Sequence, residues 1–379
     1  MSRVIFWGGI LAVVYTYLLY PALLIVLSRL RPRPARRGSI RPTVSILIAA
    51  HNEAHWIARK LESCLALAYP REKVEIVVAS DGSTDETAAI ARTYEPRGVT
   101  VLAFEHRRGK PTVLNAVVPK LRGQIVVLAD ARQVFEPGAL VALVEPFADQ
   151  EVGAVSGELM MANAAGTTVA DGVGFYWRYE KMIRYHESRC SSAVGATGAI
   201  YAIRRELFEL LPADTLLDDV LIPMTIARRG YRVMFEPAAK AFDEAAATPA
   251  QEFARKVRTI AGNFQLFLRH PWLLHPTRNP LWLQTVSHKA LRLLGPIFLV
   301  AILGSNGVLY DEPFYQVTLA LQGLLYLVAG LGWALGSAGG GHRWISVPYA
   351  FCFLNVITVI SFFRFVTGRQ TVTWTRAQQ

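Results

Sequence analysis

The chain has 379 residues, of which 52% are hydrophobic, and it carries a formal net charge of +11. This hydrophobic fraction is high for a soluble enzyme, and the excess is concentrated at the two ends of the chain. A basic chain can bind nucleic acid, but no zinc-finger or RNA-binding signature is present, which argues against that partner. The three cysteines are far apart and unpaired in spacing, which argues against a disulfide framework and a zinc site.

An uncharged apolar run at residues 5–27 is long enough to cross the roughly 30 Å hydrocarbon layer as a helix. It is too long for the core of a signal peptide and has no convincing cleavage site, so we expect a retained anchor. Three more apolar runs lie at 291–309, 315–335 and 345–366. The predicted organisation is an anchor (1–30), a basic linker (31–42), a catalytic-type α/β domain (43–250), amphipathic interface helices (251–286), a bundle of about three spans (287–368) and a tail (369–379).

Six arginines without an acid among them follow the first apolar run, from Arg29 to Arg41. The positive-inside rule therefore predicts an integral protein of a bacterial-type inner or plasma membrane, with its polar domain in the cytoplasm. We expect these arginines to face anionic membrane lipids. One span followed by three would place the C-terminal tail outside the cytoplasm. Arg369 and Arg376 in that tail favour the cytoplasmic side instead. Either the positive-inside rule fails for this short tail or one of the apolar runs is re-entrant.

The polar block alternates short β-branched runs with helical segments. Strands are predicted at 43–50, 75–80, 99–104, 124–129 and 152–156, and helices at 53–65, 84–94, 110–121, 137–147 and 220–229. The strands are continuously apolar, which is typical of a doubly wound, mainly parallel α/β sheet covered on both faces. No GxGxxG follows the first strand and no GxxxxGK[ST] occurs, which argues against a dinucleotide enzyme and a P-loop ATPase.

Four acidic motifs follow in a fixed order: AAHNEA (49–54), SDGSTDE (80–86), LADAR (128–132) and LLDDV (216–220). The first three follow strands, and the carboxyl ends of parallel strands line the ligand crevice. This order suggests a site for a metal and a phosphorylated ligand. Each motif also has a purely structural interpretation, because Asp-Gly is a turn dipeptide, Ser83 with Glu86 fits a capping box and Asn52 can cap a helix.

Within these motifs, Asn52 and Glu53 are expected in the wall of a nucleotide pocket, and Asp81 can accept a hydrogen bond from a base or a ribose. Lys110 follows a glycine turn at a helix start, where anions bind well. Asp130 ends a buried strand and needs a partner, such as Mg²⁺ with phosphate oxygens. Arg132 stands where a second metal-binding acid would be, and it could instead neutralise phosphates itself.

Asp218 and Asp219 are adjacent, so repulsion can raise the pKa of one of them and leave it poised to take a proton from a hydroxyl. Downstream, residues 253–268 form an amphipathic pattern whose apolar side is expected at the membrane interface. Arg255 and Arg258 share another face of this helix, where they can point at a leaving diphosphate.

Together these residues resemble membrane-bound family 2 glycosyltransferases, a group that includes cellulose, chitin, hyaluronan and poly-N-acetylglucosamine synthases. The resemblance covers about residues 43–269 in motif order and the terminal apolar runs in layout. It implies a GT-A nucleotide-diphospho-sugar fold and an inverting transfer. It also implies that Asp81 holds the nucleotide base, Lys110 lies beside the phosphates and Asp130 is the first acid of an Asp-x-Asp motif for Mg²⁺ or Mn²⁺. Asp219 resembles the general base, and Gly198 lies in a loop (195–199) on the acceptor side.

Three departures from the family pattern stand out. Arg132 replaces the second metal acid, and Asp218 replaces a glutamate. In the Gln-x-x-Arg-Trp motif only Arg258 is unchanged, because Arg255 stands for the glutamine and Thr259 for the tryptophan. The missing tryptophan removes an aromatic platform for an acceptor sugar, which weakens the case for a processive polymerase.

The resulting hypothesis is transfer of a hexose from a nucleotide sugar, with UDP as the expected nucleotide, to a hydroxyl. The acceptor is either a growing polysaccharide or a membrane lipid of the ceramide or polyprenol type. A different class, a non-catalytic protein that binds a nucleotide sugar, stays open because of Arg132. The sequence does not name the sugar, the linkage or the oligomeric state.

Overall fold

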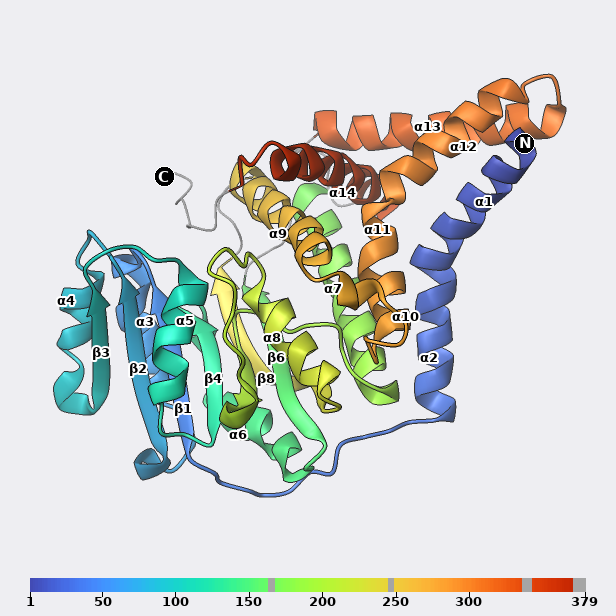
Figure 1. The fold of residues 1–379 in the computed structure, drawn as a ribbon. Coiled ribbons are helices and arrows are strands. Elements are labelled where there is room, and N and C mark those ends of the chain that lie inside the picture. Colours follow the sequence, from blue (N-terminus) through green and yellow to red (C-terminus); the bar gives the residue numbers. More distant parts are fainter. Residues whose placement is uncertain (163–167, 245–248, 336–342, 371–379) are drawn as a thin grey trace.

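The computed structural model describes residues 1–162, 168–244, 249–335 and 343–370, and its centre is one eight-stranded sheet (Figure 1). The strand order is β3-β2-β1-β4-β7-β6-β8-β5. The strands are β1 Val44–Ala50, β2 Val74–Asp81, β3 Val99–Phe104, β4 Ile125–Asp130, β5 Val134–Phe135, β6 Val152–Ala162, β7 Tyr201–Arg204 and β8 Arg232–Glu244. Strands β3, β2, β1 and β4 are parallel, whereas β7 is antiparallel to both neighbours and β5 to β8. The α/β prediction is confirmed, with a parallel half and a mixed half.

Helices cover both faces of this sheet. They are α3 Ala54–Leu65, α4 Thr87–Arg92, α5 Lys110–Val117, α6 Ala139–Val144 and α8 Asp218–Arg228. Successive residues of β1 point to opposite faces, so Ile46 and Ile48 join one core with Ile57, whereas Leu47 joins the other with Leu114. Both faces of β1 are fully buried, which explains why its sequence is continuously apolar rather than alternating.

Four elements of the domain were not predicted from the sequence: the two-residue strand β5, α7 Thr168–Cys190, β7 and β8. Strand β8 carries charged residues along much of its length, including Glu236 and Asp243, which hides its apolar face. Helix α7 is polar on average because it packs between the domain and the terminal helices rather than in one apolar core. The predicted helix at 84–94 is shorter, since only α4 is α-helical there.

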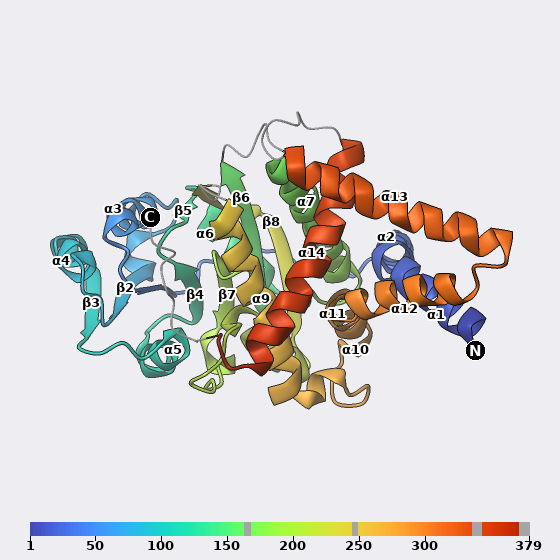
Figure 2. The same ribbon diagram turned by 90° about the horizontal axis from the view of Figure 1, so that it is seen from above.

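Helix α9 Pro249–Arg269 contains the predicted amphipathic helix, and another helix packs against part of its apolar face. The last helix, α14 Arg343–Val366, runs beside it (Figures 1 and 2). The ring of Phe264 packs on Phe362 at 5.4 Å, and Ser361 donates a hydrogen bond to the carbonyl of Val257. Helix α14 therefore covers part of this apolar side, whereas Leu268 on the same side is 69% exposed, and the placement of α9 at a membrane interface stays a prediction.

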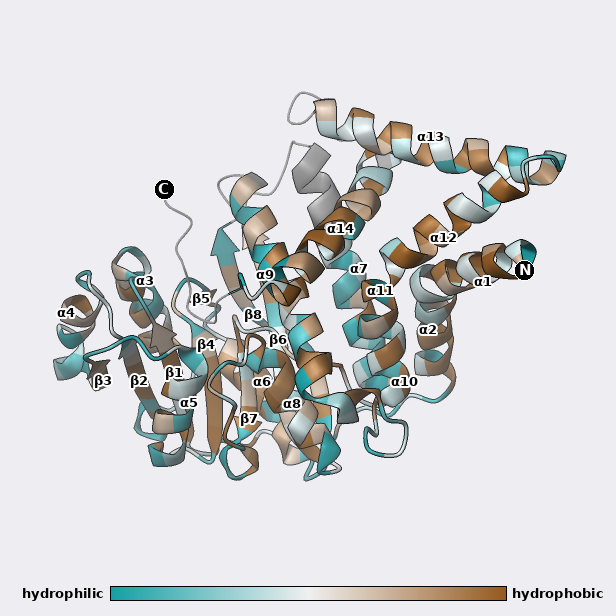
Figure 3. Ribbon diagram, turned by 45° about the horizontal axis from the view of Figure 1, so that its top comes forward, coloured by the Kyte–Doolittle hydropathy of each residue, from teal (hydrophilic) through white to brown (hydrophobic). Residues whose placement is uncertain are grey.

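Among the described residues, three helices are long and apolar enough to cross a membrane: Ser2–Leu30, α13 Pro313–Leu335 and Trp344–Val366 within α14. The first comprises α1 Ser2–Val14, a π-helical turn at Tyr15–Leu19 and α2 Tyr20–Leu30. Helices α1 and α13 project with α12 to one side of the domain (Figure 3).

The predicted apolar run at 291–309 is not one straight helix. The segment Trp282–Leu293, which contains α10 Trp282–Gln284, a π-helical stretch Thr285–Ala290 and α11 Leu291–Leu293, meets α12 Gly295–Val308 at 59°. The break falls at Pro296, which lies in the first turn of α12 and has no backbone N–H to continue the preceding helix. The pair is either one broken span or a re-entrant segment.

Two arginines of the linker contact the domain. Arg33 pairs with Glu151 at 2.7 Å, and Arg37 pairs with Glu236, whose side chain is almost fully buried. Both arginine side chains are still more than half exposed, so the expectation that the linker arginines face anionic lipid stays a prediction. Their charge is used to fasten the linker along the sheet domain.

A buried ionic cluster joins the first helix, α7 and the bent segment. His288 is fully buried, with Nε2 2.9 Å from an oxygen of Glu180 and Nδ1 2.9 Å from an oxygen of Glu187. Tyr20 donates to Glu187 at 2.7 Å, and Arg292 donates to Glu180 at 2.8 Å. Burial acts to raise the pKa of Glu180, but His288 and the neighbouring cations hold that pKa well below its usual range. Buried charges persist only when paired, so this cluster fixes the terminal helices against the domain.

His288→Ala is expected to destabilise the protein by about 3–5 kcal/mol, because two buried carboxylates lose a shared partner. Thermal unfolding of the full chain in detergent measures the effect. His275→Ala, at an exposed position, is the matched control and is expected to leave the melting temperature nearly unchanged. Equal melting temperatures for the two variants would contradict the proposed role of the cluster.

Candidate active site

A cavity of about 910 Å³ opens at the carboxyl ends of the central strands, and residues of α9 line one part of it. Ten residues singled out from the sequence line it: Asn52, Glu53, Lys110, Asp130, Arg132, Gly198, Asp218, Asp219, Arg255 and Arg258. Asp81 lines an adjoining small hollow that shares Lys110 with the cavity. The structure thus brings together residues that lie up to about two hundred positions apart in the sequence.

The centre of the cavity is a lysine surrounded by acids. Lys110 begins α5, and its Nζ lies 2.8 Å from Oδ1 of Asp130 and 3.1 Å from Oδ2 of Asp218. The side chain of Lys110 is only 8% exposed. Burial acts against the charged form, but the carboxylates of Asp130 and Asp218 outweigh it and raise the pKa of Lys110. The lysine is therefore a fixed positive charge at physiological pH.

Asp219 differs from its neighbour in its surroundings. Asp218 is buried, and Tyr201 as well as Lys110 contact its carboxylate. Asp219 is half-buried and accepts a hydrogen bond from the backbone N–H of Gly198 at 3.1 Å. Burial and the nearby charge of Asp218 raise the pKa of Asp219 to about 6. An acid that titrates there is suited to accept a proton near neutral pH.

Gly198 keeps space open between these carboxylates. A Cβ atom at this position would lie 3.2 Å from Oδ2 of Asp130 and 3.5 Å from Oδ2 of Asp219. Its carbonyl accepts from the backbone N–H of Asp130 at 3.2 Å, so the glycine loop is fixed to the end of β4. The bare backbone leaves room for a ligand between the two acids.

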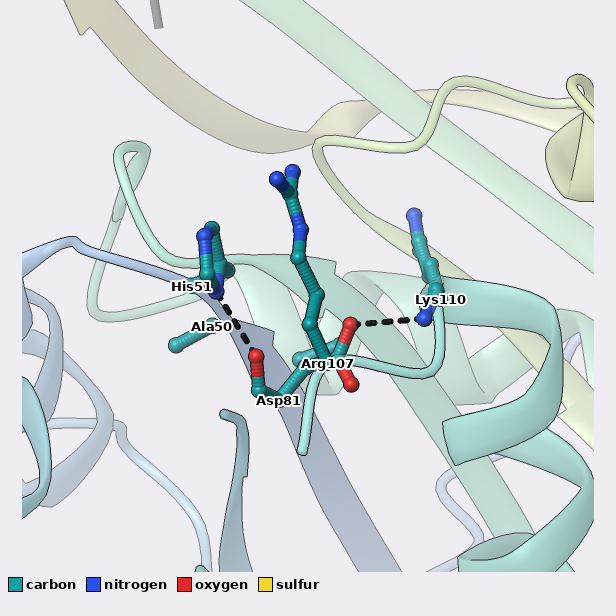
Figure 4. A pocket seen from close by; sticks show the side chains of 7 residues that line it. Ala50, His51, Asp81, Arg107 and Lys110 are labelled. Atoms are coloured by element: carbon teal, nitrogen blue, oxygen red, sulfur yellow. Dashed lines mark hydrogen bonds between the residues drawn. The ribbon is translucent and has the colours of Figure 1, made fainter. Parts of the chain in front are cut away.

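The small hollow beside the cavity is bounded by His51, Asp81, Arg107 and Lys110 (Figure 4). Asp81 ends β2, and its carboxylate accepts from the backbone N–H groups of Arg108 at 2.6 Å and Gly109 at 2.8 Å. In this state Asp81 orders the loop that leads into α5. A base or ribose donor would have to share this carboxylate with those two amides.

Asn52 and the SDGSTDE segment hold two strand-end loops together. Asn52 has a left-handed backbone (φ 55°), and its side-chain oxygen accepts from the backbone N–H of Thr84 at 2.8 Å. The carboxylate of Asp85 accepts from the backbone N–H groups of Ala54 and Thr87, so it caps the starts of both α3 and α4. Helix and turn capping therefore accounts for the contacts of these two side chains. Asp85, rather than Asn52, is the residue that caps the helices.

The side chain of Arg132 points toward Asp243 rather than into the centre of the cavity. It pairs with Asp243 of β8 at 3.2 Å, and its guanidinium lies 5.5 Å from the ring centre of Trp56. On the opposite side, Arg255 and Arg258 line the cavity from α9. Burial lowers the pKa of Arg258, against the effect of Asp218, Asp130 and Asp219, which lie near it.

The acids fit a divalent cation only in part. No cluster of three or more His, Cys, Asp or Glu side chains with metal-binding geometry occurs in the described ranges. Oδ1 of Asp130 is bonded to Lys110, and its Oδ2 faces the space beside Gly198. Asp130 thus offers one carboxylate oxygen, and a cation bound there would take other ligands from the nucleotide diphosphate and water.

Several residues of the cavity wall were not identified from the sequence. They are His51, Trp56, Trp177, Asp243 and Arg364. His51 and Trp56 lie in or directly after the AAHNEA motif, so that motif gave a local signal. Trp177 and Asp243 lie on α7 and β8, which were not predicted, and Arg364 ends α14, whose path over the cavity depends on tertiary packing.

Residues 45–211 match the family model described as glycosyl transferase family 2. Over 232 residues the chain is 25% identical to a poly-beta-1,6-N-acetyl-D-glucosamine synthase of Staphylococcus aureus, covering 60% of this chain and 56% of that protein. Over 282 residues it is 27% identical to a beta-monoglucosyldiacylglycerol synthase of Nostoc sp., covering 69% and 58%. The chain thus spans somewhat more than half the length of these curated relatives.

The fold is similar to that of the solved mannosyltransferase PcManGT from Pyrobaculum calidifontis, whose structure contains GDP-Man and Mn²⁺. The TM-score is 0.75 at 22% identity, over 97% of this chain and 100% of that one. The family 2 match thus covers residues 45–211, and the fold is the expected GT-A type.

Proposed function

We propose that this protein is an inverting glycosyltransferase that moves a hexose from a nucleotide sugar to an acceptor hydroxyl. The observation that carries the proposal is the half-buried Asp219, with its raised pKa, next to the Lys110–Asp130 pair and the open space at Gly198. A base, a fixed cation and a vacant volume in one cavity are what an in-line displacement requires. A non-catalytic binding protein would have no need for a base with a raised pKa.

The nucleotide is assigned to the hollow at Asp81 and its diphosphate to the region between Lys110 and the arginines of α9. Asp219 takes the proton of the acceptor hydroxyl while the hydroxyl oxygen attacks the anomeric carbon. The bond from that carbon to the diphosphate breaks on the opposite face, which inverts the configuration. Lys110, Arg255 and Arg258 stabilise the negative charge that grows on the leaving diphosphate.

A divalent cation, Mg²⁺ or Mn²⁺, fits this scheme because of charge balance. Asp130, Asp218 and Asp219 carry three negative charges that already balance the positive charges of Lys110, Arg255 and Arg258, so the charge of an incoming diphosphate is left unbalanced. A bound divalent ion supplies additional positive charge on the leaving group. Asp130 is the residue that would hold it.

The acceptor side remains divided between two classes. The Staphylococcus relative is named for a polysaccharide and the Nostoc relative for a lipid product, so similarity supports both. The apolar terminal helices support work at a membrane, and we assign 1–30 and 287–368 to membrane attachment, 43–250 to the catalytic domain on the cytoplasmic side and 251–286 to the interface. UDP is the nucleotide that we propose for the donor.

Asp219→Asn is expected to lower sugar transfer by at least about a thousandfold, because the amide cannot accept the acceptor proton. Binding of the nucleotide is expected to be preserved. The assay is release of labelled nucleoside diphosphate and labelled product from a panel of nucleotide sugars, with protein in native membranes supplying acceptors. Asp311→Asn, at an exposed loop position, is the control with full activity expected.

The pH dependence of the transfer rate is an independent test of Asp219 as the base. The base works in its ionised form, so the wild-type rate is expected to rise with pH and to level off above about 6, the pKa of Asp219. A rate already constant from pH 4.5 upward would contradict the raised pKa. Full transfer activity in Asp219→Asn would refute the base itself.

We expect the divalent metal to bind together with the nucleotide of the donor sugar. EDTA is expected to abolish transfer and Mn²⁺ or Mg²⁺ to restore it. The metal is expected to bind poorly to protein alone, because the described residues hold no group of three or more His, Cys, Asp or Glu ligands. Calorimetric titration of Mn²⁺ with and without nucleoside diphosphate measures this. Equally tight Mn²⁺ binding in both conditions, or full activity in EDTA, would overturn the assignment to Asp130.

A further inference from the structure

One buried carboxylate contacts both the terminal helices and the chain beside the candidate active site. Glu187 lies near the end of α7, which packs between the sheet and α2 (Figure 1). Its Oε1 atom accepts from the hydroxyl of Tyr20 at 2.7 Å and lies 2.9 Å from Nδ1 of His288. Its Oε2 atom accepts from the backbone N–H of Val194 at 3.3 Å. The two oxygens of one side chain therefore have partners in different parts of the molecule.

The segment that follows α7, residues 191–199, carries the backbone groups that hold Asp219. It contains no helix or strand and is largely buried. The backbone N–H of Ala196 donates to the carbonyl of Asp219 at 2.7 Å, and the N–H of Gly198 donates to its carboxylate at 3.1 Å. A displacement of this loop would therefore move Asp219 or release its side chain.

The 191–199 loop also packs tightly on the first turn of α8. Gly195 has a left-handed backbone (φ 86°), and a Cβ atom there would lie 3.1 Å from the side chain of Val220. Val220 directly follows the two acids at the start of α8. Because protein interiors are close-packed, a shift of the loop at Val194 is transmitted to this turn rather than absorbed by empty space.

The other partners of Glu187 belong to the terminal helices. Tyr20 begins α2 and is 1% exposed, and His288 lies in the π-helical stretch of the bent segment. Both contact the same oxygen of Glu187. A buried carboxylate is stable only when its oxygens are paired, so the present position of Glu187 requires both helices to be docked on α7.

We propose that Glu187 is a positioning residue, which makes the placement of Asp219 depend on the docking of the N-terminal helix. Glu187 acts through the 191–199 loop and does not touch the substrate. When α2 and the bent segment are docked, the loop is held and Asp219 lies beside the open space at Gly198. When they are displaced, the loop loses its bond at Val194 and transfer slows. The inference rests on the proposed function, in which Asp219 is the base.

The test compares three conservative variants of the full chain in lipid nanodiscs. Glu187→Gln keeps the shape of the side chain but replaces one oxygen by an N–H donor, so it cannot accept from both Tyr20 and Val194. Tyr20→Phe removes one hydroxyl and keeps the ring. Tyr15→Phe is the matched control, because the hydroxyl of Tyr15 lies 2.8 Å from Oγ of Ser287 and joins the same two helical segments without a bond to Glu187.

Hydrogen exchange followed by mass spectrometry reports the loop without any assay of activity. Exchange in peptides that cover residues 191–199 is expected to be about tenfold faster in Glu187→Gln and Tyr20→Phe, the size of one lost hydrogen bond. Exchange in the loop is expected to be unchanged in Tyr15→Phe. Exchange in β1 is expected to be unchanged in all three variants, which separates a local change in the loop from global destabilisation.

Steady-state kinetics report the placement of the base. The kcat is expected to fall about tenfold in Glu187→Gln and Tyr20→Phe, while KM for the nucleotide sugar stays within about twofold. The KM is preserved because no residue of the 191–199 loop lines the hollow at Asp81. Tyr15→Phe is expected to keep the wild-type kcat.

Unchanged loop exchange in both Glu187→Gln and Tyr20→Phe would overturn the proposal, as would faster loop exchange with a wild-type kcat. An equal effect of Tyr15→Phe would also overturn it, because any loosening of the helix interface would then suffice. If Glu187→Gln does not fold, Tyr20→Phe decides. Faster loop exchange in these variants, with no release of nucleoside diphosphate by wild-type protein from any nucleotide sugar, would reject the transferase assignment and support the link between helix and loop alone.

Discussion

The candidate site depends on one interaction, the buried ammonium of Lys110 between the carboxylates of Asp130 and Asp218. Three acids converge at this point, and without a cation their mutual repulsion would drive them apart or leave them protonated. The lysine holds Asp130 and Asp218 in place. The pKa of the third acid, Asp219, rises to about 6. Lys110 therefore allows the three acids to lie close together, and it also distinguishes them. Two of the acids are held by the lysine, and Asp219 is available to react.

This constraint links distant parts of the chain. Asp130 ends β4, Lys110 starts α5, and both Asp218 and Asp219 start α8, so the strand and two helix starts must meet at one point. Helix α9 covers that point and carries Arg258 into it, while α14 packs along the outer side of α9. The terminal apolar helices are in turn fixed to the domain through Glu180, Glu187 and His288. The terminal apolar helices and the cavity are thus connected by the packing of α7, α9 and α14.

Much of the fold was predictable because many of its elements follow from patterns within short stretches of the sequence. The strands β1, β2 and β4 are apolar throughout, as burial on both faces requires, and the acids at their ends were expected at one edge of the sheet. The second half of the sheet was not predictable, because β8 mixes charged and apolar residues and β7 has only four residues. For the same reason Trp177 and Asp243 were missed, since their place in the cavity follows from α7 and β8. The bend at Pro296 and the partial burial of the α9 apolar face under α14 likewise depend on contacts distant in sequence. The roles of the site residues remain predictions, although the cavity brings them together.

The most direct test of the central claim is a structure of the full chain with a non-hydrolysable nucleotide-hexose analogue and Mn²⁺. The diphosphate is predicted between Lys110 and Arg258, the base beside Asp81, and the anomeric carbon facing the space between Gly198 and Asp219. A diphosphate bound outside this cavity, or an anomeric carbon directed away from Asp219, would contradict the account.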